Sequence, residues 1–141
     1  HVIPALMYKM HVAKQNNDPF VPIWGSGAPT REFLFVDDLA DAIHFSLMNI
    51  EAKDVYSCGI SHLNVGTGIE VSISELAYTI KEVVGFNGEL KFDSSKPDGM
   101  PKRLLDVSRI HNFGWKHTTP LDVGMKLTYG WFVKNIEDLR I

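Results

Sequence analysis

The chain has 141 residues, 45% of them hydrophobic, and a formal net charge of −3, which fits one globular domain with a sizeable core. The slightly acidic balance and the lack of a basic tract argue against nucleic acid as the main partner. No apolar run approaches the roughly 20 residues of a membrane span, and no secretion signal is visible, so we expect no membrane partner.

Helices alternate with short strands in the first 50 residues. Apolar residues at helical spacing predict a helix over 3–16. Two short apolar runs, 20–24 and 32–36, predict strands on either side of a glycine-rich turn. Two aspartates then begin a helix over 37–49, because carboxylates cap free amides and suit the positive end of a helix. The side chains that we expect to face the core are Ile3, Leu6, Met7, Met10 and Ala13 in the first helix and Leu39, Ala42, Ile43, Phe45 and Leu47 in the second.

Residues 51–62 are expected to form a loop, and residues 63–65 a brief strand. The loop contains Cys58, which is the only cysteine and therefore excludes an internal disulfide. Such cysteine usage favours a reducing compartment, so we expect a cytoplasmic protein in which Cys58 is an unreactive loop thiol.

A capping box is the clearest local signal in the chain. Ser72 and Glu75 have the spacing at which each side chain hydrogen-bonds the backbone N–H of the other residue. They predict a helix that runs to Val84 and ends at Gly85, which can adopt the left-handed conformation.

The last third of the chain continues the alternation. We expect a strand over 90–92, a polar loop over 93–102 and a short helix over 106–114 that ends at a glycine. A final helix begins at Thr119 and Pro120, with a cap and a first-turn proline in suitable places. Its expected buried stripe consists of Leu121, Met125, Thr128 and Phe132. Helices that alternate with short strands are typical of the α/β class.

The stretch from Trp24 to Arg31 suggests a site for a phosphorylated ligand that contains a ring. Trp24 offers a flat surface to a base or sugar, and Arg31 offers a planar fork of donors that matches phosphate oxygens. The glycines between them let the backbone approach a ligand. A surface hairpin with a packed tryptophan and a solvated arginine is the alternative that these residues leave open.

The polar segment 96–103 holds the second group of candidate binding residues. Asp98 can accept hydrogen bonds from ribose hydroxyls or from a guanine edge, and the lysines and arginine beside it could meet phosphate. Two prolines and a glycine shape the segment. A solvated, charged loop is the alternative here.

Other kinds of site are incomplete in this sequence. Gly66-Thr67-Gly68 follows the expected strand as a dinucleotide-binding loop would, but Val71 stands where a third glycine is needed. We therefore expect only a tight turn at these glycines. No tyrosine is followed four residues later by lysine, the pair with which short-chain reductases donate a proton. The six histidines lack the spacing of metal ligands, so no metal site is expected.

Several segments of the chain form a recognisable set: His1-Val-Ile-Pro-Ala-Leu, Trp24-Gly-Ser-Gly, Arg31-Glu-Phe-Leu with Val-Asp-Asp, Asn64-Val-Gly-Thr-Gly, Phe92-Asp-Ser-Ser-Lys-Pro-Asp98-Gly and Lys102-Arg-Leu-Leu-Asp-Val. Together they resemble the GDP-L-fucose synthase family of extended short-chain dehydrogenases/reductases. The resemblance implies that residues 1–141 are a single fragment, the C-terminal substrate-binding part of an enzyme of the NAD(P)-binding Rossmann superfamily, with most of the Rossmann core missing. The lack of an initiator methionine agrees with that expectation.

The family converts GDP-4-keto-6-deoxy-D-mannose to GDP-L-fucose by epimerising carbons 3 and 5 and then reducing the 4-keto group with NADPH. The resemblance implies that His1 lies beside the cofactor and the sugar and acts as an acid/base in the epimerisation. It further implies that the GDP-sugar is bound by Lys9, Trp24, Arg31 and Asp98. Lys9 stands where some members have arginine, which keeps the charge but loses the two-pronged geometry.

By the same resemblance, NADPH is bound mainly by an N-terminal part outside this chain, which also supplies a Ser-Tyr-Lys set and a reactive cysteine. Cys58 does not match that cysteine. The complete enzyme is expected to be a homodimer. Two alternatives stay open: another nucleotide-sugar epimerase or dehydratase of the superfamily, and a non-catalytic module that binds nucleotide sugars.

Overall fold

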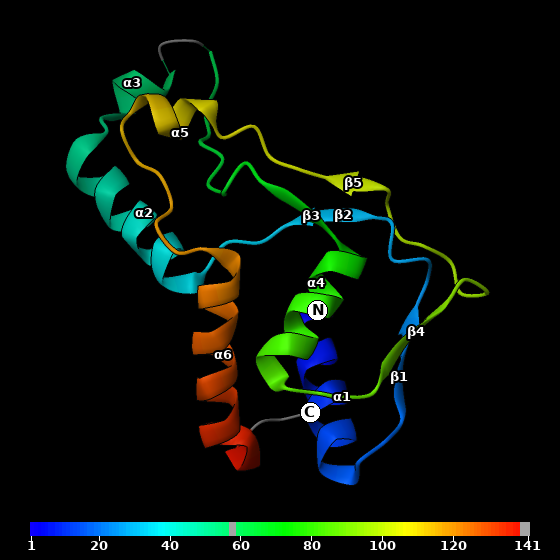
Figure 1. The fold of residues 1–141 in the computed structure, drawn as a ribbon. Helices are drawn as coiled ribbons and strands as arrows, with labels where there is room; N and C mark the ends of the chain where they lie inside the picture. The colour runs from blue at the N-terminus through cyan, green and yellow to red at the C-terminus, as the bar shows by residue number, and fades with distance from the viewer. Residues whose placement is uncertain (57–58, 139–141) are drawn as a thin grey trace.

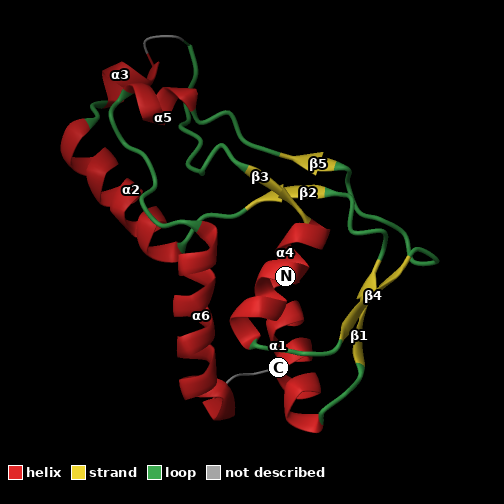
Figure 2. Ribbon diagram, in the orientation of Figure 1, coloured by secondary structure: helices red, strands yellow, loops and turns green. Residues whose placement is uncertain are grey.

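Within residues 1–56 and 59–138, which the computed structural model describes, the fold consists of helices and two small β-sheets (Figures 1 and 2). Cys58 lies outside the described residues, so its expected inertness stays a prediction. In chain order the elements are α1 (Val2–Asn16), β1 (Phe20–Trp24), β2 (Thr30–Glu32), α2 (Val36–Asn49), α3 (Ala52–Tyr56), β3 (Glu70–Ser72), α4 (Ile73–Val84), β4 (Glu89–Asp93), β5 (Lys102–Arg103), α5 (Ser108–Asn112), α6 (Leu121–Asn135) and a short 3₁₀ turn, η1 (Ile136–Asp138).

The two sheets fix the positions of the candidate binding residues. In the first sheet β1 and β4 are parallel, and Trp24 lies opposite Asp93 where both strands end. In the second sheet β2 lies between β3, which is antiparallel to it, and β5, which is parallel. Arg31 is therefore opposite Val71 on one side and Arg103 on the other. A residue on a strand that is paired on both sides has little backbone freedom.

The main core lies between α1, α4 and β1, and α6 packs on α4 (Figure 1). The expected buried face of α1 is confirmed. Its core residues are Leu6, Met7, Met10 and Ala13, with Ile3 partly buried at the edge. Burial of large apolar side chains, at roughly 1.5–3 kcal/mol each, thus holds the helix on which Lys9 is exposed.

The ends of α4 are also as predicted. The Ser72 hydroxyl accepts from the Glu75 N–H at 3.1 Å, and the Glu75 carboxylate accepts from the Ser72 N–H at 2.8 Å. Gly85 follows the helix with a φ of 70°, the left-handed conformation that a residue with a side chain rarely adopts. Local chemistry therefore sets both ends of this helix.

The expected inner face of α2 is wrong for three residues. Leu39, Ile43 and Leu47 are 41%, 54% and 79% exposed. Ala42 and Phe45 are as expected: Ala42 belongs to a second apolar cluster, which includes Trp115, and Phe45 is partly buried against it. Helical spacing shows which side chains share a face, but it does not show which face the rest of the chain covers.

Several short elements also differ from expectation. The strand expected over 32–36 is displaced to β2, because β3 and β5 offer partners only to residues 30–32. Residues 63–65 form no strand, and the expected loop 51–62 contains α3. Strands of two or three residues, such as β5 and β3, are too short to show an alternating pattern, so neither was expected. The strand expected over 90–92 lies within β4, and the short helix before Gly114 is α5.

The stripe expected on α6 is confirmed in part. Met125 and Phe132 are buried and Leu121 is partly buried, whereas Thr128 is exposed and donates to the Gly124 carbonyl at 2.8 Å. A hydroxyl that bonds its own helix backbone needs no place in the core. None of the helices in the described part of the chain is long and apolar enough to span a membrane.

The predicted side-chain caps of α2 and α6 are wrong. Phe35 is the N-cap of α2 and Pro120 that of α6, and neither helix has a side-chain cap. Asp38 is instead buried and accepts from the Thr118 N–H at 3.2 Å, the Thr118 hydroxyl at 3.0 Å and the Thr119 N–H at 3.1 Å. This carboxylate ties the start of α2 to the start of α6.

We expect Asp38→Asn to lower the free energy of unfolding by about 1–3 kcal/mol, because an amide nitrogen cannot accept the hydrogen bond that it replaces. Burial raises the pKa of Asp38, but the hydrogen bonds from Thr118 and Thr119 outweigh burial, and the pKa lies below its usual value of 3.8. The stabilisation is therefore present above the unfolded pKa and is lost as the pH falls through the lower folded pKa. Urea unfolding at several pH values measures it. Asp37→Asn, an exposed change in the same helical turn, is the control, and an equal loss in both variants would contradict the assignment.

Candidate functional site

The turn after β1 presents Trp24 to solvent. The ring is 70% exposed, and the backbone then bends through Gly25 and Gly27, with φ values of 86° and 79°. A Cβ on Gly27 would lie 2.6 Å from the Phe92 ring, so this glycine is needed for space as well as for its dihedral angle. The turn is thus packed tightly over β4 and keeps the indole at the end of the first sheet.

Asp98 reaches this turn from the segment that follows β4. Its carboxylate accepts from the Ser26 N–H at 2.8 Å and from the Ser26 hydroxyl at 2.6 Å. A Cβ on Gly25 would collide with the same carboxylate. The hydrogen bonds from Ser26 lower the pKa of Asp98, so the carboxylate is ionised at neutral pH. The two stretches that the sequence singled out separately are therefore in direct contact.

Arg31 lines a cavity of about 550 Å³ together with His1 and Arg103. Its guanidinium is half-buried and donates from Nη1 to the Thr30 carbonyl at 2.6 Å. His1, at the start of α1, and Arg103, on β5, contribute side chains from two other elements. The rest of the lining is Val2, Glu32, Phe33, Ile73 and Leu105. Two guanidinium groups at one cavity suit an anionic ligand.

The segment 96–103 joins the two halves of the site. Asp98 contacts the turn beside Trp24, and a Cβ on the next residue, Gly99, would lie 3.3 Å from Nη2 of Arg31. Four residues further on, Arg103 reaches the cavity. The structure therefore places the candidate residues in two groups that segment 96–103 connects. His1 and Arg31 line one cavity, whereas Asp98 contacts the turn beside Trp24 and the Lys9 ammonium lies 5.7 Å from the centroid of the Trp24 ring.

Sequence reasoning missed the role of Glu32. Its carboxylate accepts from the Gly68 N–H at 2.6 Å and from the Leu105 N–H at 3.0 Å, and a Cβ on Gly66 would collide with it. The tight strand-to-helix turn expected at these glycines is not found: the chain bends at Gly66 and Gly68 and leads into the strand β3. The Glu32 carboxylate occupies the Gly68 amide. Ser26 was missed as well, because its partner lies 72 residues away.

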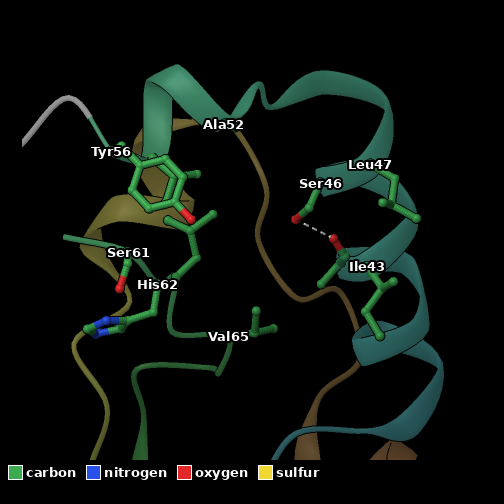
Figure 3. A pocket seen from close by; sticks show the side chains of 11 residues that line it. Ile43, Ser46, Leu47, Ala52, Tyr56, Ser61, His62 and Val65 are labelled. Carbon is green, nitrogen blue, oxygen red and sulfur yellow. Dashed lines mark hydrogen bonds between the residues drawn. The ribbon is translucent and has the colours of Figure 1, made fainter.

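A second hollow, of about 420 Å³, lies between α2, α3 and residues 61–65 (Figure 3). Its walls are mostly apolar side chains such as Ile43, Leu47 and Val65. The Ser46 hydroxyl in it donates to the Ala42 carbonyl at 2.7 Å, so it is not free for a ligand. Tyr56, Ser61 and His62 also line the hollow, but no lysine or arginine is among its described lining residues, so it is a poor site for a phosphorylated ligand. Among the residues that the structure describes, no group of three or more potential metal ligands is found.

Comparison with known proteins points to one family. A model of the NAD dependent epimerase/dehydratase family matches residues 1–66. Probable GDP-L-fucose synthase 1 of Oryza sativa subsp. japonica is 53% identical over 136 residues, which is 96% of this chain and 39% of that protein. The chain spans about two-fifths of the length of the curated relatives it matches.

Solved structures agree with the sequence matches. A GDP-L-fucose synthetase from Naegleria fowleri bound to NADP has a TM-score of 0.88 and 30% identity, over 100% of this chain and 42% of that one. A GDP-mannoheptose C4 reductase from Campylobacter jejuni with NADP bound has a TM-score of 0.84 and 42% identity, over 94% of this chain and 45% of that one. The expected α/β class is confirmed. Over nearly its whole length this chain is similar to a part of the GDP-L-fucose synthases, and its first 66 residues match the NAD dependent epimerase/dehydratase family.

Proposed function

We propose that this chain is the GDP-sugar-binding part of a longer GDP-L-fucose synthase, which converts GDP-4-keto-6-deoxy-D-mannose to GDP-L-fucose with NADPH. The observation that carries the proposal is that one segment, 96–103, contacts both the turn beside Trp24 and the guanidinium of Arg31 and ends at the cavity that Arg31 lines. Guanidinium and ammonium groups suit a diphosphate, and an exposed indole suits a base or a sugar ring. The chain is net acidic, so this basic site is a local feature rather than part of a general positive field.

Each site residue has a role in this proposal. Arg31 and Lys9 bind the diphosphate, Trp24 stacks on a ring of the ligand, and Asp98 belongs to the GDP-sugar site. His1 stands at the edge of the cavity, where it can contact both the sugar and the nicotinamide and can exchange protons with the sugar carbons. NADPH itself is held mainly by residues outside this chain. The Gly68 N–H supports this proposal, because it already donates to the Glu32 carboxylate and is therefore not available to a cofactor phosphate.

A homodimer and a cytoplasmic location are part of the same proposal. The first follows from the family resemblance, and the second from the single cysteine. Size-exclusion chromatography with light scattering on the complete protein tests the dimer.

We expect the 141-residue chain alone to oxidise no NADPH, because it has no Tyr-x-x-x-Lys pair to donate a proton during reduction. The complete protein should oxidise NADPH with GDP-4-keto-6-deoxy-D-mannose and should not act on UDP-glucose. An NADPH absorbance assay measures both. NADPH oxidation by the isolated chain would contradict the proposal that the reaction needs residues outside this chain. Turnover of UDP-glucose would contradict the proposed GDP-sugar substrate.

A second candidate is a GDP-sugar reductase that does not epimerise. The similarity to the GDP-mannoheptose C4 reductase from Campylobacter jejuni favours it. Product analysis separates the two, because only a fucose synthase inverts carbons 3 and 5 before reduction. A protein that binds GDP-sugars without any turnover would point to a non-catalytic module.

A further inference from the structure

Two lysines from different parts of the chain approach the exposed Trp24 ring. The ammonium nitrogen of Lys9, on α1, lies 5.7 Å from the ring centroid, and that of Lys96, after β4, lies 5.9 Å from it. Cations at this distance are attracted by the electron-rich face of an indole. The two ammonium groups nevertheless repel each other, because both are positive and close to the same ring.

Neither lysine is neutralised within the described residues. The ion pairs found there involve other lysines: Lys53, Lys91, Lys102 and Lys126. Asp98 lies two residues beyond Lys96, but its oxygens accept from Ser26. The Trp24 ring thus has two positive charges near it, and an anionic ligand bound there would neutralise them.

The backbone on both sides of Lys96 is fixed. On one side the Lys96 N–H donates to the Asp93 carbonyl at 3.1 Å, and the Asp93 side chain accepts from the Ser95 N–H at 3.0 Å. On the other side Asp98 is held by Ser26. We call these two hydrogen bonds the Ser26–Asp98 clasp. The clasp holds segment 96–103 against the turn that follows Trp24. Pro97 between the two anchors removes further freedom.

We propose that Lys96 is a further binding residue for the phosphates of a nucleoside diphosphate, held at Trp24 by the Ser26–Asp98 clasp. The inference rests on the proposed function, since it concerns the same GDP-sugar site. It gives Asp98 a positioning role through Ser26. Lys9 and Lys96 then contact phosphate oxygens from two elements, while the indole meets a ring of the same ligand.

The test is calorimetric titration of the complete protein with GDP and, separately, with guanosine. Lys96→Gln should weaken GDP binding about fivefold, the effect of one exposed charge pair, and should leave guanosine binding unchanged. Lys91→Gln is the matched control. Lys91 also lies over an aromatic ring, 4.1 Å from the centroid of Phe20, and Phe20 begins the strand that Trp24 ends. It should change neither affinity.

The outcomes distinguish the role of Lys96 from the proposed function, which is GDP-sugar binding at this site. Equal GDP affinity in the wild type and Lys96→Gln overturns the role of Lys96 while the GDP site stands. A wild type that binds GDP no better than guanosine overturns both. Weaker guanosine binding in Lys96→Gln would also count against the inference, because it would show a disturbed Trp24 rather than a lost charge.

The clasp is tested by Ser26→Ala, and the control is Ser94→Ala, a change of an exposed serine in the turn just before Lys96. Ser26→Ala should weaken GDP binding by a smaller factor than Lys96→Gln, because the lysine remains but is held less firmly. In a double variant the effect of Ser26→Ala should shrink, since the two residues act on one interaction. Full additivity would show that Ser26 does not act through Lys96 and would overturn the positioning role.

Discussion

In the complete protein, His1→Gln is expected to slow epimerisation by about 10²–10⁴-fold, the usual effect of removing a general acid or base. Inverting a carbon next to a ketone requires a proton to leave one face and return to the other. An imidazole can take or give a proton near neutral pH, whereas an amide cannot. His1 fits the role because it is exposed at the start of α1 and lines the cavity of Arg31.

Incorporation of solvent deuterium at carbons 3 and 5 measures this step directly. His44→Gln is the control, because His44 is exposed on α2, outside the cavity lining. Exchange at the wild-type rate with a raised KM would show that His1 only binds the ligand. The acid/base would then lie elsewhere.

Arg31→Ala should weaken GDP-sugar binding by about 10–100-fold, equivalent to one charge-assisted hydrogen bond of roughly 1.5–3 kcal/mol. The expected loss exceeds that of Lys9→Ala for two reasons. A guanidinium can hold two phosphate oxygens at once, and the Arg31 side chain is partly buried and already hydrogen-bonded to the Thr30 carbonyl, so it loses less freedom on binding. Lys9 extends from an exposed position of a helix.

Fluorescence or calorimetric titration with the GDP-sugar measures the order of these effects. Arg31→Lys keeps the charge and loses the two-pronged geometry, so it should give an intermediate affinity. Trp24→Ala should lower the affinity for the GDP-sugar, because the stacking contact is lost, and should leave the affinity for NADPH nearly unchanged. If Arg31→Ala binds as tightly as the wild type, Arg31 is not in the site.

Elements with a local cause were predictable from the sequence. The helix between Ser72 and Gly85 carries its start and stop signals within its own residues, and the apolar face of α1 follows from spacing alone. Trp24 and Arg31 could be named as candidate binding residues from their chemistry, and their role stays a prediction. These features need no knowledge of the rest of the fold.

Features that depend on distant partners were not predictable. β5 is a strand only because β2 lies beside it, and Asp38 turned from an expected cap into a link to Thr118. The contact between Ser26 and Asp98 spans 72 residues and has no local pattern. For α2, the spacing identified an apolar stripe. Contact with the cluster around Trp115 determines which side of the helix is buried, and the spacing does not show that contact.

The carboxylate of Glu32 links the bend at 66–68 to the proposed phosphate site, although that bend lies outside the cavity lining. Glu32 is the neighbour of Arg31 on β2, and it is anchored at once to Gly68 and to Leu105, two residues beyond Arg103. Surface turns usually tolerate changes of length. In this protein, we expect a longer loop at 66–68 to loosen the anchors of Glu32 beside Arg31 and of Leu105 beside Arg103. If the proposed site is correct, phosphate affinity should fall although the loop touches no ligand.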